Sequence, residues 1–140
     1  MVVRVKVRII RENFNKSREV VVLVNSGAES EEPVVVVYPD VVDVLGFSID
    51  DFDLIEVELA SGKTHNLISK EKVRVELLDE KGNSLSSIYA YLAVDESLTE
   101  PLITDITIDE LGIQVISFKK GLWRHINDPP NTVRKSASPK

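Results

Sequence analysis

The sequence predicts a mostly β domain, a closed barrel or sandwich that carries two short helices. Short apolar runs that alternate with polar residues recur along the chain, as expected of half-buried strands. Glycine, proline, asparagine and serine separate these runs at short spacing, as they do in all-β domains. The 140 residues suffice for one domain with a hydrophobic core, and 43% of them are hydrophobic.

The first part of the chain is expected to hold three strands and a helix. Residues 3–10 alternate apolar and basic side chains, which predicts a half-buried strand. Residues 18–24 end in a continuous apolar run rich in valine, which predicts a strand buried on both faces. Residues 33–38 form a third strand bounded by prolines, and residues 39–46 form a short helix that stops at Leu-Gly.

A hairpin is expected next. Residues 55–59 alternate apolar and acidic side chains, and the chain then returns through residues 64–68. Between them, Ser61, Gly62 and Lys63 form a polar, glycine-containing sequence that suits a tight turn.

The rest of the chain adds strands, a second helix and a tail. In order, we expect strands at 72–78, 87–94 and 102–103, a helix at 105–111, and strands at 115–118 and 122–125. Residues 127–140 contain three prolines and little apolar surface, which predicts a flexible C-terminal tail. The folded domain is therefore expected to span residues 1–126.

The amino-acid composition excludes several kinds of functional site. The chain has no cysteine, which excludes disulfides and thiolate sites and fits a reducing cytoplasm. It has no continuous apolar run typical of a signal peptide or a membrane span, so we expect a cytoplasmic protein without a membrane partner. His65 and His125 have no metal ligands at suitable spacing and are expected at the surface, so no cofactor or metal is expected.

Charge is distributed unevenly along the chain, whose net charge is -6. Residues 1–18 and 119–140 each carry six basic side chains and one acid, whereas residues 29–58 carry ten acids and no Lys or Arg. The acidic middle, and the lack of aromatic residues interleaved with basic ones, argue against a nucleic-acid partner. We expect the basic ends to pair with an acidic surface of the same dimer.

One segment has the residues of a functional turn. A buried strand is expected to end here in a turn, in the segment Leu23-Val24-Asn25-Ser26-Gly27-Ala28. Within the turn, Gly27 allows close backbone approach. The sequence of the segment resembles that of the retropepsin-like aspartic proteases of the single-domain, homodimeric class, which place a hydrophobic pair before Asp-Thr/Ser-Gly-Ala.

Other parts of the chain follow the same order as in that family. A short helix ending in Leu-Gly follows the turn, and a hairpin similar to the family's flap comes next, at residues 58–64. A late apolar strand, Pro101 to Thr104, then precedes a second helix ending in Leu-Gly. The resemblance covers about residues 3–126. It implies a homodimer of retropepsin-like closed barrels, in which each chain supplies half of a peptide-binding cleft.

The resemblance also implies roles for single residues. Asn25, Ser26 and Gly27 occupy the positions of the family's catalytic triplet. Substrate-contacting positions are implied at Ala28 and in the flap, at Ala60, Ser61, Gly62 and Lys63. No cofactor or metal is implied.

Two residues depart from the family pattern, because Asn25 replaces the catalytic aspartate and Thr104 replaces a glycine. In the family, two close carboxylates share a proton, and they act as general base and general acid. An amide cannot act as a base, although it can still form hydrogen bonds. Glu29 and Asp105 are the nearest substitute acids, but neither reproduces a symmetric pair.

We therefore expect a retropepsin-like protein that is catalytically impaired and binds an extended peptide in a dimer cleft. An alternative is an active aspartic endopeptidase in which the aspartate at position 25 was changed to asparagine or is restored by deamidation. Another alternative is a non-enzymatic homodimeric interaction or regulatory module.

Overall fold

The computed structural model describes the backbone of residues 2–59 and 62–139, and the side chains of these residues except those of 56–65. The prediction of a mostly β domain with two short helices is confirmed. The helices are α1 (Pro39–Val44) and α2 (Asp105–Leu111), and short 3-10 turns occur at Glu12–Phe14 and Ile49–Asp51. The strands are β1 (Arg4–Arg11), β2 (Lys16–Val24), β3 (Val34–Val37), β4 (Phe52–Leu59), β5 (Gly62–Ser69), β6 (Val73–Leu78), β7 (Ser84–Val94), β8 (Leu102–Ile103), β9 (Ile113–Ser117), β10 (Leu122–His125) and β11 (Arg134–Lys135).

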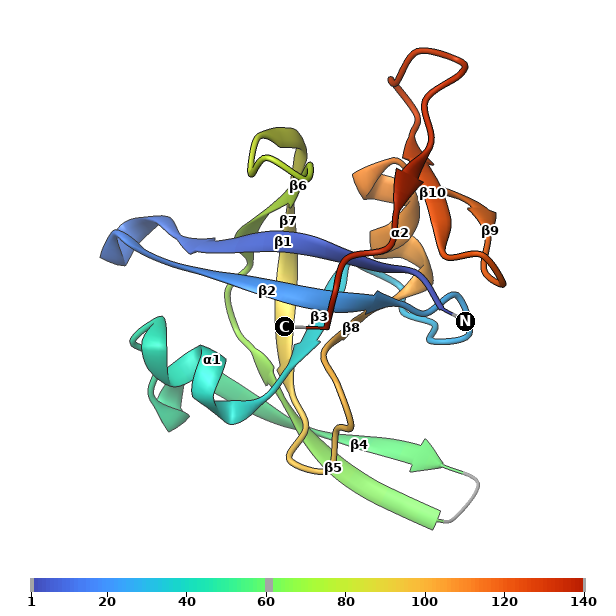
Figure 1. Ribbon diagram of the computed structural model, residues 1–140. Helices are drawn as coiled ribbons and strands as arrows, with labels where there is room; N and C mark the ends of the chain where they lie inside the picture. The colour runs from blue at the N-terminus through green and yellow to red at the C-terminus, as the bar shows by residue number, and fades with distance from the viewer. Residues whose placement is uncertain (1, 60–61, 140) are drawn as a thin grey trace.

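Six strands close into a barrel in the order β3-β8-β2-β1-β6-β7. The ring is closed by parallel pairing of β3 with β7, from Val34 opposite Tyr91 to Val37 opposite Val94 (Figure 1). Strand β8 lies between β2 and β3, parallel to the first and antiparallel to the second. Closure gives each of these strands a neighbour on both sides, which removes the exposed edges of an open sheet.

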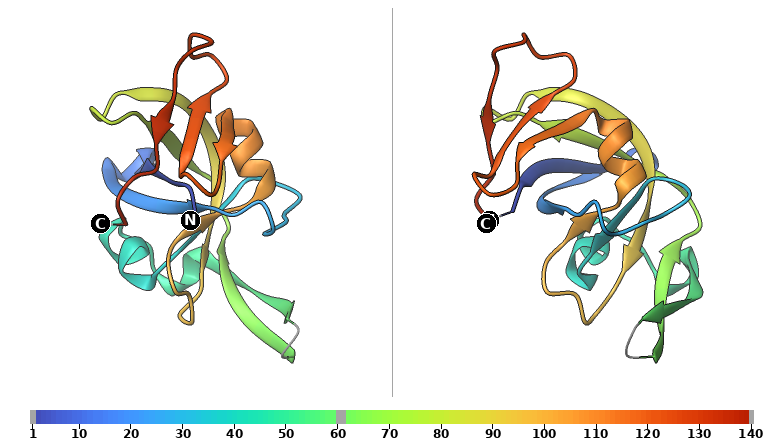
Figure 2. Two further views of the ribbon diagram at one scale, coloured as in Figure 1. Left: turned by 45° about the vertical axis from the view of Figure 1, so that its right-hand side comes forward. Right: turned by 90° about the vertical axis from the view of Figure 1, so that its right-hand side faces the viewer.

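Two smaller units extend from the barrel. The β4–β5 hairpin continues the sheet beyond β7, while β9, β10 and β11 form a separate three-stranded sheet. The views agree that the hairpin projects from one end of the barrel and the small sheet lies at the other (Figures 1 and 2). Helix α2 lies beside the small sheet.

Strand β2 corrects one expectation from the sequence. We expected burial on both faces, but only Val20, Val22 and Val24 are buried, whereas Val21 and Leu23 are half-buried. In a closed barrel one face of each strand points into the core and the other points outward. The continuous apolar run therefore reflects partial cover on the outside, where α1 packs against β2.

The C-terminal segment makes specific contacts that the sequence did not predict. Within it, β11 pairs with β10, and the Ala137 N–H donates to the Arg4 carbonyl at 2.8 Å. Asp128 and Arg134 form a buried ion pair. The segment is thus held by backbone hydrogen bonds and charges rather than by apolar side chains, and composition does not reveal such contacts. Its mobility remains a prediction.

Basic residues of the N-terminal strands pair with the acidic middle within one chain. Arg18 lies 3.4 Å from Asp40, and Arg11 lies 3.6 Å from Asp51. The Arg11 guanidinium is itself buried and stacks on the ring of Phe47. The expected charge pairing therefore needs no second copy at these positions. Within the described ranges, no helix is both long enough and apolar enough to cross a membrane.

Candidate functional site

The turn at Asn25 closes directly after β2. The Ala28 N–H donates to the Asn25 carbonyl at 3.1 Å, and the Gly27 N–H donates to Asn25 Oδ1 at 3.1 Å. The backbone of the turn therefore holds the Asn25 side chain by its oxygen. Asn25 is half-buried, while Ser26 and Gly27 are exposed. The turn presents small residues and one amide side chain to the outside of the barrel.

Strand β8 and the start of α2 hold the turn at both ends. The Asn25 N–H donates to the Ile103 carbonyl at 3.3 Å, and the Asp105 N–H donates to the Ala28 carbonyl at 2.8 Å. Strand β8 is itself fixed between two barrel strands. The turn therefore rests on the barrel frame, which is the arrangement that positions a functional group accurately.

Asp105 uses one of its carboxylate oxygens to hold the backbone next to this turn. Its Oδ1 accepts the N–H of Ser30 at 3.2 Å and the N–H of Ile106 at 2.7 Å. These bonds tie the loop that follows the turn to the first turn of α2. Glu29, the other substitute acid considered from the sequence, is exposed.

Thr104, which replaces the glycine of the family pattern, is buried within a chain of hydroxyl groups. Its Oγ1 lies 2.7 Å from Ser30 Oγ and 2.8 Å from Thr107 Oγ1. Thr107 donates to the Val34 carbonyl at 3.0 Å and accepts the Val34 N–H at 2.8 Å. These bonds join the loop after the Asn25 turn, strand β3 and helix α2, so Thr104 has a role that a glycine could not have.

The hairpin compared with a flap on the basis of the sequence is formed by β4 and β5. Its ladder runs from Phe52 opposite Ser69 to Leu59 opposite Gly62. Ala60 and Ser61 lie outside the described residues, and Gly62 and Lys63 begin β5, where the Lys63 side chain is not described. The views place the loop between β2 and β3 on the same side of the barrel as the hairpin (Figures 1 and 2). In the part of the chain that the structure describes, no hydrogen bond joins the two.

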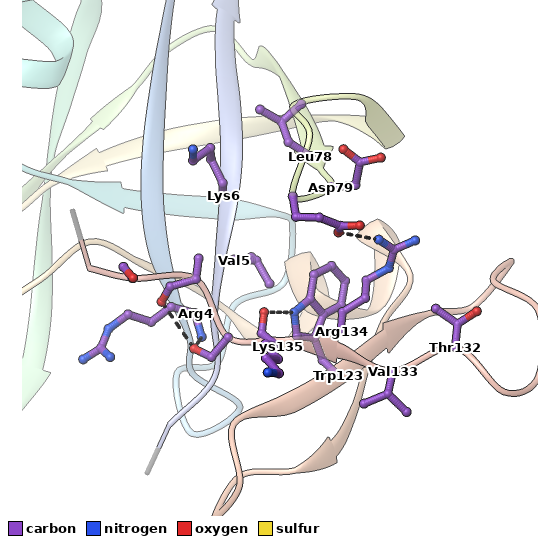
Figure 3. Close-up of a pocket in the computed structure, with 14 residues that line it drawn as sticks. Arg4, Val5, Lys6, Leu78, Asp79, Trp123, Thr132, Val133, Arg134 and Lys135 are labelled. Atoms are coloured by element: carbon purple, nitrogen blue, oxygen red, sulfur yellow. Dashed lines mark hydrogen bonds and ion pairs between the residues drawn. The ribbon is translucent and has the colours of Figure 1, made fainter.

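A cavity of about 670 Å³ lies away from this turn, beneath the C-terminal segment (Figure 3). It is bounded by the start of β1, the end of β6 and the turn that follows, Trp123, and residues 132–138. Trp123 is buried, and its indole N–H donates to the Lys135 carbonyl at 3.3 Å. None of residues 25–28 lines this cavity, so it is separate from the Asn25 turn.

Arg134 lies over Trp123 at this cavity and carries two ion pairs. Its Nε and Nη2 contact the Asp128 carboxylate at 2.8 and 2.7 Å, and its Nη1 contacts Glu80 at 2.9 Å. The hydrogen bonds from Arg134 lower the pKa of Asp128 to about 2. The sequence did not predict this cluster, because Asp128 and Arg134 fall in the expected tail. The one signal was a tryptophan immediately before a segment with few apolar residues.

His125 corrects another expectation, because it is buried rather than at the surface. Its Nε2 lies 3.0 Å from the Leu111 carbonyl, and its Nδ1 lies 3.2 Å from the Asn127 N–H. These partners require hydrogen on Nε2, which makes His125 a structural link between α2 and β10. The His65 side chain lies outside the described set. No group of three metal-ligating side chains occurs among the described residues.

Comparison with known proteins adds no family assignment. No family model matches the chain, and a search of curated proteins finds no match.

Proposed function

We propose that this chain is a retropepsin-like homodimer that binds an extended peptide or protein segment between two copies and does not activate water. The supporting observations are the closed barrel, the turn after its second strand, and the projecting hairpin on the same side. They follow the order of parts on which the sequence resemblance rests. The proposal therefore includes the family's peptide-binding cleft but not its hydrolysis of peptides.

The observation that carries the proposal is the state of the Asn25 side chain. Its oxygen accepts the Gly27 N–H, so the amide nitrogen takes no part in that bond. Among the described residues, no acceptor is hydrogen-bonded to that nitrogen. An amide nitrogen donates to a peptide carbonyl but cannot take a proton from water. Asn25 is thus suited to holding a peptide and unsuited to cleaving it.

The hairpin supplies a second binding element in this proposal. Strand β4 is the last strand in the order of the eight-stranded sheet, and among the residues that the structure describes it is paired along one of its two edges, by β5. Such an edge accepts an extended peptide by main-chain hydrogen bonding. A single chain has one Asn25 turn and one β4–β5 hairpin, so a two-fold axis is needed to complete a symmetric cleft.

Peptide binding tests the proposal. We expect fluorescein-labelled peptides from casein to bind the wild-type protein, as measured by fluorescence anisotropy, and to remain uncleaved. Gly27→Leu should abolish binding and keep the fold, because the position is exposed and a Cβ there meets only Asn25 Oδ1, at 3.4 Å. Gly82→Asn, on a turn away from the cleft, is the matched control and should bind like wild type, since asparagine tolerates the positive φ of 84°. Equal binding by the Gly27→Leu variant would rule out a cleft at this turn.

A further inference from the structure

Asn25 and Ser26 form a dipeptide whose backbone and side chain can react with each other. The backbone nitrogen of Ser26 directly follows Asn25 in the chain. The carbon of the Asn25 side-chain amide is Cγ. In the described part of the chain, the Ser26 N–H has no hydrogen-bond partner, and Ser26 and Gly27 are exposed. The Gly27 N–H donates to Asn25 Oδ1, the oxygen on which negative charge develops when Cγ is attacked.

From this arrangement we propose that Asn25 is a self-modifying site that converts to a carboxylate. Water removes the proton of the Ser26 N–H, and the nitrogen attacks Asn25 Cγ to form a bond. The bond between Cγ and Nδ2 then breaks, and Nδ2 leaves as ammonia after taking a proton. The product is a cyclic imide. Water then adds to either of its carbonyl carbons and breaks that carbon's bond to the Ser26 nitrogen, which gives aspartate or isoaspartate. No oxidant or reductant is involved.

The chain contains an internal comparison, because Asn83 is also followed by a serine. Both asparagines are hydrogen-bonded through their backbone: the Asn83 N–H donates to Asp79 Oδ1 at 2.8 Å and its carbonyl accepts the Asp79 N–H at 2.8 Å, much as the backbone of Asn25 bonds to Ile103 and Ala28. The two sites differ at the serine, because Ser84 is the first residue of β7 and pairs with Leu78, whereas Ser26 lies in the turn. A strand residue cannot easily rotate to bring its nitrogen onto the neighbouring side chain. The same dipeptide therefore lies in a fixed hairpin at one site and in an exposed turn, with small residues and an oxyanion donor, at the other.

Conversion at Asn25 has a consequence that rests on the proposed function. If two copies meet at this turn, aspartates formed at position 25 stand close together, and two close carboxylates share a proton. That is the pair of groups needed to activate water and to protonate a carbonyl. The modification itself stands on the geometry of the turn alone.

The test follows both asparagines in one sample. Full-length protein is incubated warm at neutral pH, digested at intervals, and the peptides containing Asn25 and Asn83 are quantified by mass spectrometry. In the folded protein we expect Asn25 to convert several-fold faster than Asn83, and in urea the two rates should become similar. Ser26→Val, with a branched side chain on the attacking residue, should slow conversion in the folded protein several-fold.

Three results would overturn the proposal: an Asn25 that keeps its amide, an Asn25 no faster than Asn83, or a rate ratio unchanged by urea. A casein-cleavage assay on the same samples separates the two proposals. Conversion without binding or cleavage of casein peptides supports the self-modifying site and defeats the peptide cleft.

Discussion

Arg134 and Asp128 form a two-bonded ion pair, with Nε to Oδ2 at 2.8 Å and Nη2 to Oδ1 at 2.7 Å. Both side chains are largely buried, with 14% and 7% of their surface exposed. Asp128 also accepts the His125 N–H at 2.8 Å. The pair therefore fastens the C-terminal segment to β10, and breaking it would leave a charge without compensation in a poorly solvated place.

The first prediction concerns acid stability. The pKa of Asp128 is about 2 in the folded protein, below its ordinary value of 3.8, chiefly because of the hydrogen bonds from Arg134. A carboxylate whose pKa is lowered by folding stabilises the folded protein at pH values above the pKa of the unfolded chain. This contribution is lost as pH falls from about 4 through about 2. It amounts to about 2 kcal/mol at neutral pH. Urea unfolding between pH 2 and pH 6 should show this loss.

Arg134→Ala tests that assignment. It should destabilise the protein by about 2–4 kcal/mol at neutral pH and reduce the loss between about pH 4 and pH 2. Arg18→Ala is the matched control, because its contact with Asp40 at 3.4 Å is exposed and such pairs contribute about 0–1 kcal/mol. If the acid-induced loss is unchanged in Arg134→Ala, another carboxylate is responsible.

The second prediction concerns truncation. Ending the chain after Asp128 removes β11, the Arg134 ion pairs and the cover over Trp123. We expect a lower melting temperature and a red-shifted tryptophan fluorescence, since Trp123 is the only tryptophan in the sequence. Ending it after Ser138 keeps these contacts and is the control. Equal melting of both forms would show that the segment adds no stability.

Much of the fold could be predicted because its signals are local. Helix α2 has the predicted bounds, since Gly112 ends it with a φ of 78° that glycine adopts easily. Strands β8 and β10 also match their predicted ranges. Closure of the barrel was harder to predict from the sequence, because β3 pairs with β7 more than fifty residues later.

The candidate site was predicted in part for the same reason. The turn at Asn25 follows from its own sequence, whereas the hydroxyl chain through Ser30, Thr104 and Thr107 joins segments that are distant in the chain. The burial of His125 depends on a carbonyl of α2, and the contacts of the C-terminal segment depend on Asp128. Such pairings follow from the folded topology and leave no periodic pattern in the sequence.

The third prediction concerns the hydroxyl chain. Thr104→Val keeps the size of the side chain and removes its hydroxyl group, which leaves Ser30 and Thr107 with one partner fewer. We expect a loss of about 1–3 kcal/mol in the free energy of unfolding, measured in urea. Thr132→Val, at a half-buried position in the C-terminal segment, is the control. A Thr104→Val variant as stable as the control would show that this contact contributes nothing.

The fourth prediction concerns assembly. A symmetric cleft needs two copies, so sedimentation equilibrium at micromolar concentration should give about twice the chain mass of 15.6 kDa. Gly27→Leu places a large side chain at the exposed turn and should weaken this association. Arg134→Ala changes the protein at the separate cavity, so its folded form should remain dimeric. A wild-type protein that sediments as a monomer would contradict the proposed cleft.

The last prediction concerns Asn25→Asp. The substitution preserves the shape of the side chain, and Oδ1 can still accept the Gly27 N–H, so the turn should keep its form. Two aspartates across the dimer axis would share one proton and titrate as a pair, with one pKa raised. Hydrolysis of casein should then appear with an optimum on the acid side of neutrality, at a rate about 10²–10⁴-fold above that of wild type. Asn83→Asp introduces the same charge on the β6–β7 turn and should remain inactive.

If Asn25→Asp binds casein peptides but cleaves none, the cleft lacks the geometry for catalysis. If it neither binds nor cleaves them, the dimer cleft proposed here is wrong.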